Sequence, residues 1–156
     1  MGERSGVLQR LIGGYKFKNM YNAYQPLSAL LLDRLDQLPA TTIVVPVPTV
    51  ASHIRERGYD HTLLLAKQVA AQRHLSLQQV VTRVTSAKQR DASRRRRIAQ
   101  AKVAFKVTSK IDPAASYLLI DDVVTTGATI KYAAKALRQA GASQVWVAVI
   151  ARQPLD

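Results

Sequence analysis

The chain has 156 residues, the length of one ordinary domain, and 47% of them are hydrophobic, which is enough to build a core. It contains no cysteine, which excludes disulfides, thiolate catalysis and cysteine-ligated zinc and fits a reducing, cytoplasmic setting. No apolar run is long enough for a membrane-spanning helix, so we expect no membrane insertion. The formal net charge of +13 favours phosphorylated partners, whether nucleotides, nucleic acid or an anionic membrane surface.

The first half of the chain predicts helical stretches on either side of one short strand. Residues up to about Leu38 have a mostly helical pattern, in which Pro26 opens the most regular part. The run 43–47 is rich in β-branched residues and contains a proline, which predicts a buried strand that enters a turn. In residues 62–74 the apolar side chains recur on one helical face, which predicts a helix.

The second half predicts four strands and a helix. Residues 79–84 and 102–107 have the composition of strands. Residues 117–120 form a continuous apolar run, typical of a strand that is buried on both faces of a parallel sheet. The apolar residues within 130–137 recur at helical spacing, and the run 145–150 predicts a last buried strand.

The order of these elements predicts the fold class. Strands that alternate with helices indicate a single α/β domain with a largely parallel sheet. Within it we expect a helical segment over residues 1–40 and a core over residues 41–156. Trp146 falls within the last strand pattern, so we expect its side chain in the core rather than in a site.

The most informative stretch is YLLIDDVVTTGATI, residues 117–130. An apolar strand ends in Asp121 and Asp122, and a turn of threonine and glycine leads directly into a helix. Ligands of open α/β sheets bind at the carboxyl ends of the strands, where this turn must lie. Closely spaced backbone N–H groups at a helix N-terminus bind phosphate, and Gly127 permits a positive φ. The two carboxylates then suit ribose hydroxyls or a hydrated magnesium ion, although plain helix capping by Asp or Thr is the alternative.

Positive charge is concentrated between Arg83 and Lys110, where ten basic residues stand against a single acid, Asp91. Three interpretations stay open: a solvated charged segment, a loop that closes over a ligand, and a contact surface for single-stranded DNA. Aromatic residues are sparse here, with only Phe105 close by, so a base-stacking platform is not indicated. The candidates for nucleic-acid contact are four consecutive residues, Arg94, Arg95, Arg96 and Arg97.

The sequence DDVVTTGAT looks like the phosphoribosyl-pyrophosphate (PRPP) signature of the type I phosphoribosyltransferases. Further segments narrow the resemblance to the ComF family of competence-associated phosphoribosyltransferase-like proteins, and it then runs from about Tyr15 to Arg152. The resemblance implies the type I fold, in which helices flank a mostly parallel sheet and a mobile basic loop closes over the site. The segments that carry it are YKFKN, VPVP followed by RERGYDH, and the block of Gln89, Arg97, Gln100 and Phe105.

The resemblance also implies a role for each part of a ligand site. Asp121 and Asp122 would bind the ribose hydroxyls, residues 125–129 would hold the 5′-phosphate, and the turn after the first strand would meet the pyrophosphate. From the basic loop, Lys88, Arg90 and Arg97 are candidates to contact the ligand, and the candidates for catalysis are Asp121, Asp122, Arg97 and Lys88. The ribose and phosphate set is Asp121, Asp122, Val123, Val124, Thr125, Thr126, Gly127, Ala128 and Thr129, and the pyrophosphate set is Pro46, Val47, Pro48, Arg55 and Arg57.

The function implied by the resemblance is binding of PRPP with magnesium, in which the metal is held through the ligand and not by the protein alone. Transfer of the phosphoribosyl group to an unidentified acceptor would follow, in a process linked to DNA uptake or repair. The implied partners are PRPP, single-stranded DNA and competence or helicase proteins, and a homodimer stays open. The alternative is a module that binds single-stranded DNA on the same fold without turnover.

Three features depart from the family pattern. Family members commonly carry an N-terminal cysteine zinc module, and this chain has no cysteine. The usual RGFNQ reads RGYDH here, so that Asp60 and His61 replace an amide pair. Gln100 stands where asparagine is usual. His61 could serve as a general base or could cap and pack a helix, and both interpretations stay open.

Overall fold

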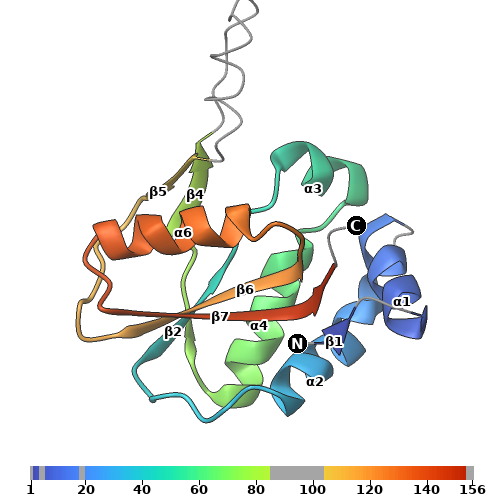
Figure 1. Cartoon of the computed structure of the whole chain (residues 1–156), viewed down its shortest axis with the longest axis horizontal. Helices are drawn as coiled ribbons and strands as arrows, with labels where there is room; N and C mark the ends of the chain where they lie inside the picture. The colour runs from blue at the N-terminus through green and yellow to red at the C-terminus, as the bar shows by residue number, and fades with distance from the viewer. Residues whose placement is uncertain (1, 4–5, 18–19, 85–103, 154–156) are drawn as a thin grey trace, which may run out of the picture.

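A computed structural model describes residues 2–3, 6–17, 20–84 and 104–153. Its centre is a parallel sheet with helices on both faces (Figure 1). The α/β class and the largely parallel sheet predicted from the sequence are therefore confirmed. The strand order across the sheet is β1 (Gly2–Glu3), β7 (Gln144–Arg152), β6 (Ser116–Val124), β2 (Thr42–Pro46) and β3 (Ser76–Leu77).

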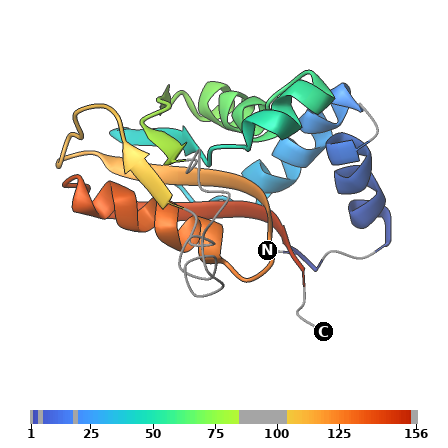
Figure 2. The same ribbon diagram turned by 90° about the horizontal axis from the view of Figure 1, so that it is seen from above.

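Helices form a layer on each side of the sheet (Figure 2). One face carries α2 (Tyr24–Asp33) and α4 (His61–Arg73), and the other carries α6 (Ala128–Gln139). An antiparallel hairpin of β4 (Val81–Val84) and β5 (Ala104–Val107) packs beside α6. The remaining helices are α1 (Gly6–Phe17), the 3-10 helix η1 (Tyr21–Ala23) and α3 (Ala51–Arg57). In the part of the chain that the structure describes, no helix has the length and apolar character needed to cross a membrane.

The sheet separates two hydrophobic cores. Successive residues of β6 point to opposite faces, as in any strand. Leu118 and Ile120 pack in a core that α1, α2 and α4 complete, whereas Tyr117 and Leu119 pack in a second core under α6 and the hairpin. Because both faces are covered, this strand lacks alternating polar residues. Ile12 of α1 is fully buried in the first core, so the segment before β2 packs on the same sheet.

The helix predicted to continue to Leu38 ends earlier. Helix α2 stops at Asp33, and the φ of Arg34 is −111°, outside the helical region. Leu38 precedes Pro39, and a residue before proline is biased away from the helical conformation. Leu35 and Leu38 still pack against the first core from the loop, so their apolar character reflects burial rather than helical periodicity.

The prediction that Trp146 lies in the core is wrong. Its side chain is 49% exposed, and that of Val147 is 45% exposed. Strand β1 pairs with β7 only at Ala151 and Arg152, so most of β7 lies at the edge of the described sheet. An apolar strand pattern does not distinguish an edge strand from a central one. The short elements α3 and β3 were not predicted from the sequence either.

Candidate functional site

The candidate site lies where β6 extends beyond its neighbour β2. Pairing between these strands ends with Pro46 opposite Ile120, whereas β6 stays paired with β7 as far as Val124. The Val47 N–H donates to the Ile120 carbonyl at 2.9 Å, and the chain then leaves the sheet. One side of β6 is therefore open from Asp121 onward, at the carboxyl edge of the sheet.

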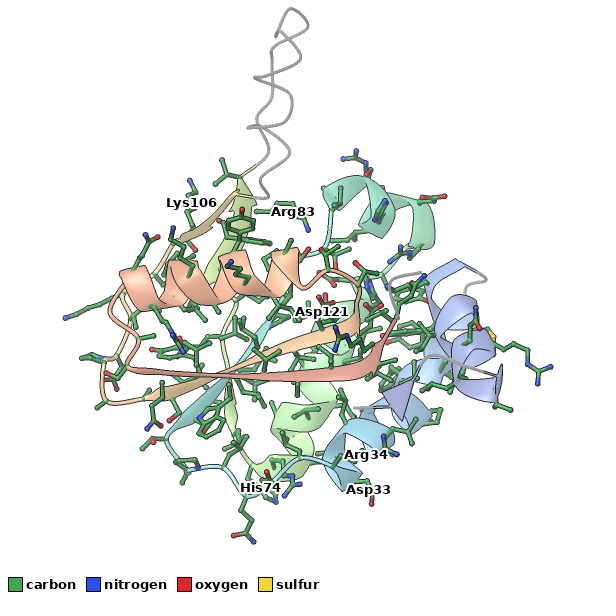
Figure 3. All side chains as sticks on the ribbon, in the orientation of Figure 1. Asp33, Arg34, His74, Arg83, Lys106 and Asp121 are labelled. Atoms are coloured by element: carbon green, nitrogen blue, oxygen red, sulfur yellow. The ribbon has the colours of Figure 1, made fainter. Side chains whose placement is uncertain are left out.

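Asp121 is partly exposed at this open edge (Figure 3). Its Oδ1 accepts a hydrogen bond from the Asp122 N–H at 2.9 Å. Burial, together with the negative charge of Asp122, raises the pKa of Asp121 to about 7. Near neutral pH this carboxyl therefore exchanges between its charged and neutral forms, and it can accept or donate a hydrogen bond to a hydroxyl group.

Asp122 has the opposite surroundings, since only 2% of its surface is exposed. Its Oδ2 lies 2.8 Å from Lys16 Nζ in α1 and 3.1 Å from Nε2 of His61 at the start of α4. Its Oδ1 accepts from the Val123 N–H at 2.6 Å. Burial by itself would raise the pKa of Asp122, but the hydrogen bond from His61 and the charge of Lys16 outweigh it and hold that pKa below its usual range.

Two tyrosines fasten α1 to the turn between α3 and α4, next to this ion pair. The fully buried Tyr15 donates its hydroxyl to the His61 carbonyl at 2.7 Å, and burial raises the pKa of Tyr15 above its ordinary value. Tyr59 donates its hydroxyl to the Tyr15 carbonyl. The Tyr15 ring centroid lies 5.6 Å from that of Tyr59 and 6.1 Å from that of His61. Residues 15–16 and the segment RGYDH, distant in the sequence, therefore meet at Asp122.

The turn after β6 provides the N-terminus of α6. Gly127 has a φ of 76°, in the left-handed region where an L side chain is strained. Thr126 Oγ1 accepts from the Ala128 N–H at 3.3 Å, and the Lys131 N–H donates to the Gly127 carbonyl at 2.9 Å. The N–H groups of the first helical turn have no acceptor within the helix, so an anion can bind there. The predicted phosphate site, residues 125–129, lies at this helix N-terminus.

A polar cluster holds the loop that follows β2. Asp60 caps α4, with its Oδ1 accepting from the Leu63 N–H at 3.2 Å and from Thr49 Oγ1 at 2.9 Å. Thr62 Oγ1 donates to the Val47 carbonyl at 2.9 Å. The predicted pyrophosphate turn, residues 46–48, is thereby fixed at the sheet edge beside β6. Asp60, one of the departures from the family pattern, has a capping role here.

The predicted arginines on α3 have different surroundings. Arg55 is exposed, whereas Arg57 Nη1 lies 2.9 Å from His61 Nδ1. Arg57 is thus held against the group that contacts Asp122. Of the interpretations left open for His61, its 7% exposure and its contacts on both ring nitrogens favour a packed, hydrogen-bonded role.

Arg83 is a basic residue of the site that the sequence did not single out. It is partly buried in β4, with its guanidinium carbon 5.3 Å from the Phe105 ring centroid. Desolvation lowers the pKa of Arg83, and the negative charge of Asp121 raises it. Figure 3 shows Arg83 near the N-terminal end of α6, on the side where Asp121 is labelled. The alternation of side chains along a strand is the sequence signal that could have identified Arg83, since it places Arg83 on the same face of β4 as the buried Val81.

The structure thus brings the two aspartates together with the turns 125–129 and 46–48. It adds Lys16 and Arg83, which the sequence did not connect to the site, and it places His61, a candidate general base in the sequence, against Asp122. The loop residues predicted to contact a ligand or DNA lie outside the described residues, and their roles stay predictions. They are Lys88, Arg90, Arg94, Arg95, Arg96 and Arg97, and Gln89 and Gln100 of the family block lie outside the described residues too.

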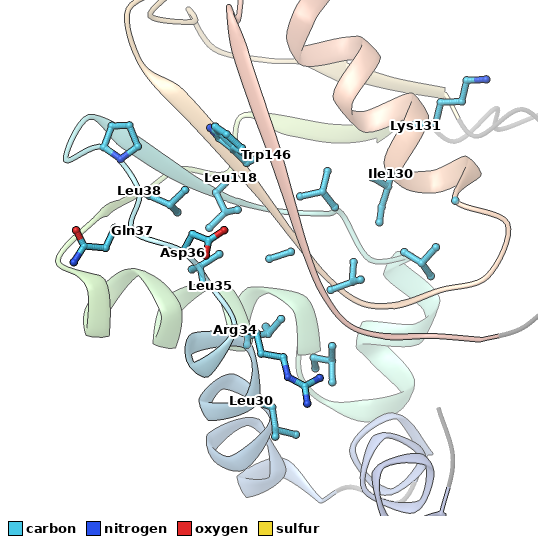
Figure 4. Close-up of a pocket in the computed structure, with 18 of the residues that line it drawn as sticks. Leu30, Arg34, Leu35, Asp36, Gln37, Leu38, Leu118, Ile130, Lys131 and Trp146 are labelled. Carbon is cyan, nitrogen blue, oxygen red and sulfur yellow. The ribbon is translucent and has the colours of Figure 1, made fainter. Parts of the chain in front are cut away.

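A large apolar cavity of about 930 Å³ lies along β7 instead of at the phosphate turn (Figure 4). Leucines from α2 and the following loop form one wall, and Trp146 and Ile130 contribute to the others. With the predicted ligand set it shares only Val124 and Gly127. The lining is mostly apolar apart from Arg34, Asp36, Gln37 and Lys131, and it contains neither Asp121 nor Asp122, so the PRPP site is not assigned to this cavity.

Comparisons with known proteins identify the family of this chain. A family model described as the phosphoribosyl transferase domain matches residues 59–156. The chain belongs to this family. It is 32% identical over 155 residues to Competence protein F of Haemophilus influenzae, covering 93% of this chain and 68% of that protein. The protein is accordingly a ComF-like member of the phosphoribosyltransferase family.

Solved structures of this family share the fold. Adenine phosphoribosyltransferase from Rhodothermus marinus superposes with a TM-score of 0.51 at 12% identity, over 95% of this chain and 85% of that chain. Glutamine PRPP amidotransferase from B. subtilis gives a TM-score of 0.56 at 16% identity, over 81% of this chain. The match spans only 26% of the amidotransferase chain. These likenesses establish a shared fold.

Proposed function

We propose that this protein binds PRPP at the carboxyl edge of β6, with Asp121 facing the ribose hydroxyls and the turn 125–129 holding the 5′-phosphate. The observation that carries the proposal is a partly exposed carboxylate, Asp121, six residues before the positive-φ Gly127 at the start of α6. The helix N-terminus attracts a phosphate dianion, whereas the carboxylate repels it. A ligand with a sugar next to its phosphate satisfies both groups, and membership of the family supports the same choice.

Magnesium would accompany PRPP. Among the described residues, no group of three His, Asp or Glu side chains could hold a metal ion. The oxygens of PRPP would therefore supply most of the ligands, and Asp121 offers a carboxylate of the kind that magnesium prefers. When bound, the ion would neutralise charge on the pyrophosphate and so favour its departure.

The pyrophosphate end of the ligand would meet the turn 46–48. This turn lies beside Asp121 because the Val47 N–H is bonded to the Ile120 carbonyl. Arg83 adds a cation whose charge interacts with Asp121. In this proposal Lys88 and Arg97 from the basic loop complete the neutralisation of the leaving group.

The reaction we propose is transfer of the phosphoribosyl group to a nitrogen nucleophile or a similar acceptor. The bond between ribose C1 and a pyrophosphate oxygen breaks, and its electron pair leaves with the pyrophosphate. A lone pair of the acceptor forms the new bond to C1, and the acceptor then releases its proton to solvent. Positive charge develops on the ribose in the transition state, where an ionised Asp121 would stabilise it. The name of the Haemophilus relative refers to competence, and we propose DNA uptake as the process served here.

The test of PRPP binding is calorimetric titration with and without magnesium. We expect magnesium-dependent binding that Asp121→Asn weakens by more than about tenfold, since a charged hydrogen bond to the ribose is lost. Asp33→Asn is the matched control, because Asp33 is an exposed carboxylate on α2, and it should leave the affinity unchanged. Absence of binding by the wild-type protein at millimolar PRPP would refute the proposal.

A second candidate function is binding of single-stranded DNA through the basic stretch between Arg83 and Lys110. The observation that favours it is the density of charge there, ten basic residues against one acid. Replacing Arg94 to Arg97 with serine should lower the slope of log K against log salt by roughly 3, since about four phosphate contacts are lost. An unchanged slope would exclude these arginines from the DNA interface.

A further inference from the structure

Asp122 was predicted to bind ribose, yet protein groups surround its carboxylate. Lys16 Nζ and His61 Nε2 both contact Oδ2, and the Val123 N–H occupies Oδ1. With 2% of the residue exposed, a ligand hydroxyl could reach this carboxylate only if Lys16 or His61 moved away. Asp121 is partly exposed by comparison, and its described contact is the N–H of Asp122. The two aspartates therefore have different tasks.

The contacts of His61 determine its protonation state. The guanidinium of Arg57 can only donate, so His61 Nδ1, which lies 2.9 Å from Arg57 Nη1, must be the acceptor. An accepting Nδ1 carries no proton, and the ring proton is then on Nε2. There it faces Asp122 Oδ2, which lies 3.1 Å from Nε2. His61 is a neutral imidazole in this arrangement.

Because His61 is neutral, Lys16 is the cation that balances the charge of Asp122. The other charged groups around the ring are differently engaged: Arg57 donates to its far side, and Asp60 caps α4. Tyr15 stays protonated, since its hydroxyl donates to the His61 carbonyl. Without Lys16 the buried carboxylate would face a neutral ring, and an uncompensated buried charge is costly.

We propose that Lys16 is a positioning residue of the ligand site: by pairing with Asp122 it anchors the end of β6 and leaves the ligand hydroxyls to Asp121. The proposal rests on the proposed function for the identity of the ligand. Asp122 Oδ1 holds the Val123 N–H, and β6 passes into the phosphate turn just beyond it. A displaced Asp122 would therefore move both Asp121 and the turn that follows.

The first test uses the ligand-free protein and nitrogen-15 NMR of the histidine rings. In the wild type we expect the spectrum of a neutral His61 with its proton on Nε2. In Lys16→Met the Oδ2 atom of Asp122 loses its cation, so the nitrogen-15 resonance of His61 Nε2, which lies 3.1 Å from Oδ2, should shift. Lys67→Met, an exposed position on α4, is the control and should leave the spectrum unchanged. A proton on Nδ1 in the wild type, or an unchanged His61 in Lys16→Met, would overturn the proposal.

The second test is titration of magnesium and PRPP into the same variants. We expect Lys16→Met to weaken binding by about tenfold or more, as for other residues that orient a ligand-binding group, and Lys16→Arg to restore most of the affinity. Circular dichroism establishes that each variant is folded. Equal affinity of Lys16→Met and the wild type would overturn the positioning role. Absence of binding by the wild type would instead refute the proposed function, and the NMR result would still decide whether Lys16 balances Asp122.

Discussion

Asp121 and Asp122 are neighbours in the chain, and the pleat of β6 points them to opposite faces of the sheet. Asp122 continues the face of Leu118 and Ile120, and there it meets Lys16 from α1 and His61 from α4. Asp121 continues the other face, where the hairpin places the charge of Arg83 near it. Asp122 is held by Lys16, His61 and the Val123 N–H, whereas Asp121 is partly exposed.

At the residue scale, we predict that Asp121→Asn stabilises the protein at high pH. The pKa of Asp121 is raised to about 7 in the folded state, above its value in the unfolded chain. The stability contributed by this group is present at acid pH and is lost as the pH rises through about 7. The gain in Tm from Asp121→Asn should be larger at about pH 8 than at about pH 5. An equal change in Tm at both pH values, which is what we expect for the control Asp33→Asn, would contradict this prediction.

Asp122→Asn, at the neighbouring position, should instead destabilise the protein. The folded-state pKa of Asp122 is lowered, so its contribution to stability is present above the unfolded pKa and is lost only in acid. Removing the carboxylate leaves Lys16 and His61 without their anion, at a cost of about 3 kcal/mol. Urea unfolding at neutral pH measures this loss of stability. An Asp122→Asn protein as stable as the wild type would show that the ion pair is not maintained in solution.

At the scale of elements, the start of α4 depends on Asp60. Asp60→Ala removes the acceptor for the Leu63 N–H and for the Thr49 hydroxyl, and it should cost about 1–2 kcal/mol in the free energy of unfolding. Asp60→Asn restores the residue type of the family pattern and keeps an acceptor oxygen, so it should cost less than about 0.5 kcal/mol. Urea unfolding of both variants tests whether Asp60 acts as a capping acceptor or through its negative charge. If the charge were required, Asp60→Asn would be as unstable as Asp60→Ala.

The docking of α1 is a second property of elements. Tyr15→Phe removes a buried hydrogen bond to the His61 carbonyl and should destabilise the protein by about 1–2 kcal/mol. Tyr132→Phe, on the partly buried face of α6, is the comparison and should cost less. We expect Tyr15→Phe also to increase amide hydrogen exchange in α1, which this contact ties to α4. Unchanged exchange there would mean that apolar packing alone holds the helix.

At the scale of the whole molecule, the position of β7 at the sheet edge decides the surroundings of Trp146. As the single tryptophan in the chain, it reports its own exposure, which is 49% in the structure. We expect its fluorescence to be quenched by iodide, with the urea-unfolded protein as the reference for full access. Trp146→Ala should cost less than about 2 kcal/mol, below the range of about 3–5 kcal/mol for a buried tryptophan. Resistance to iodide would show that another surface covers β7 in solution.

The sequence by itself determined the features that depend on neighbours in the chain. Apolar periodicity predicted the α/β class and the main elements, because strand and helix periods are local properties. The turn that joins β6 to α6 was predictable for the same reason, since the acids, Gly127 and the start of α6 lie close together in the sequence. The end of α2 was not predictable from the sequence, because a leucine that packs on the core from a loop gives the same apolar pattern as a leucine in a helix.

Only the tertiary structure decided which groups surround each residue of the candidate site. Lys16 and Asp122 are far apart in the chain, and no pattern indicates that their side chains lie 2.8 Å apart. The different burial of the two aspartates, and the charge of Arg83 beside one of them, depend on which elements cover each face of β6. The exposure of Trp146 likewise depends on the order of strands in the sheet. Burial and electrostatics arise from all neighbours in space, and the fold alone brings those neighbours together.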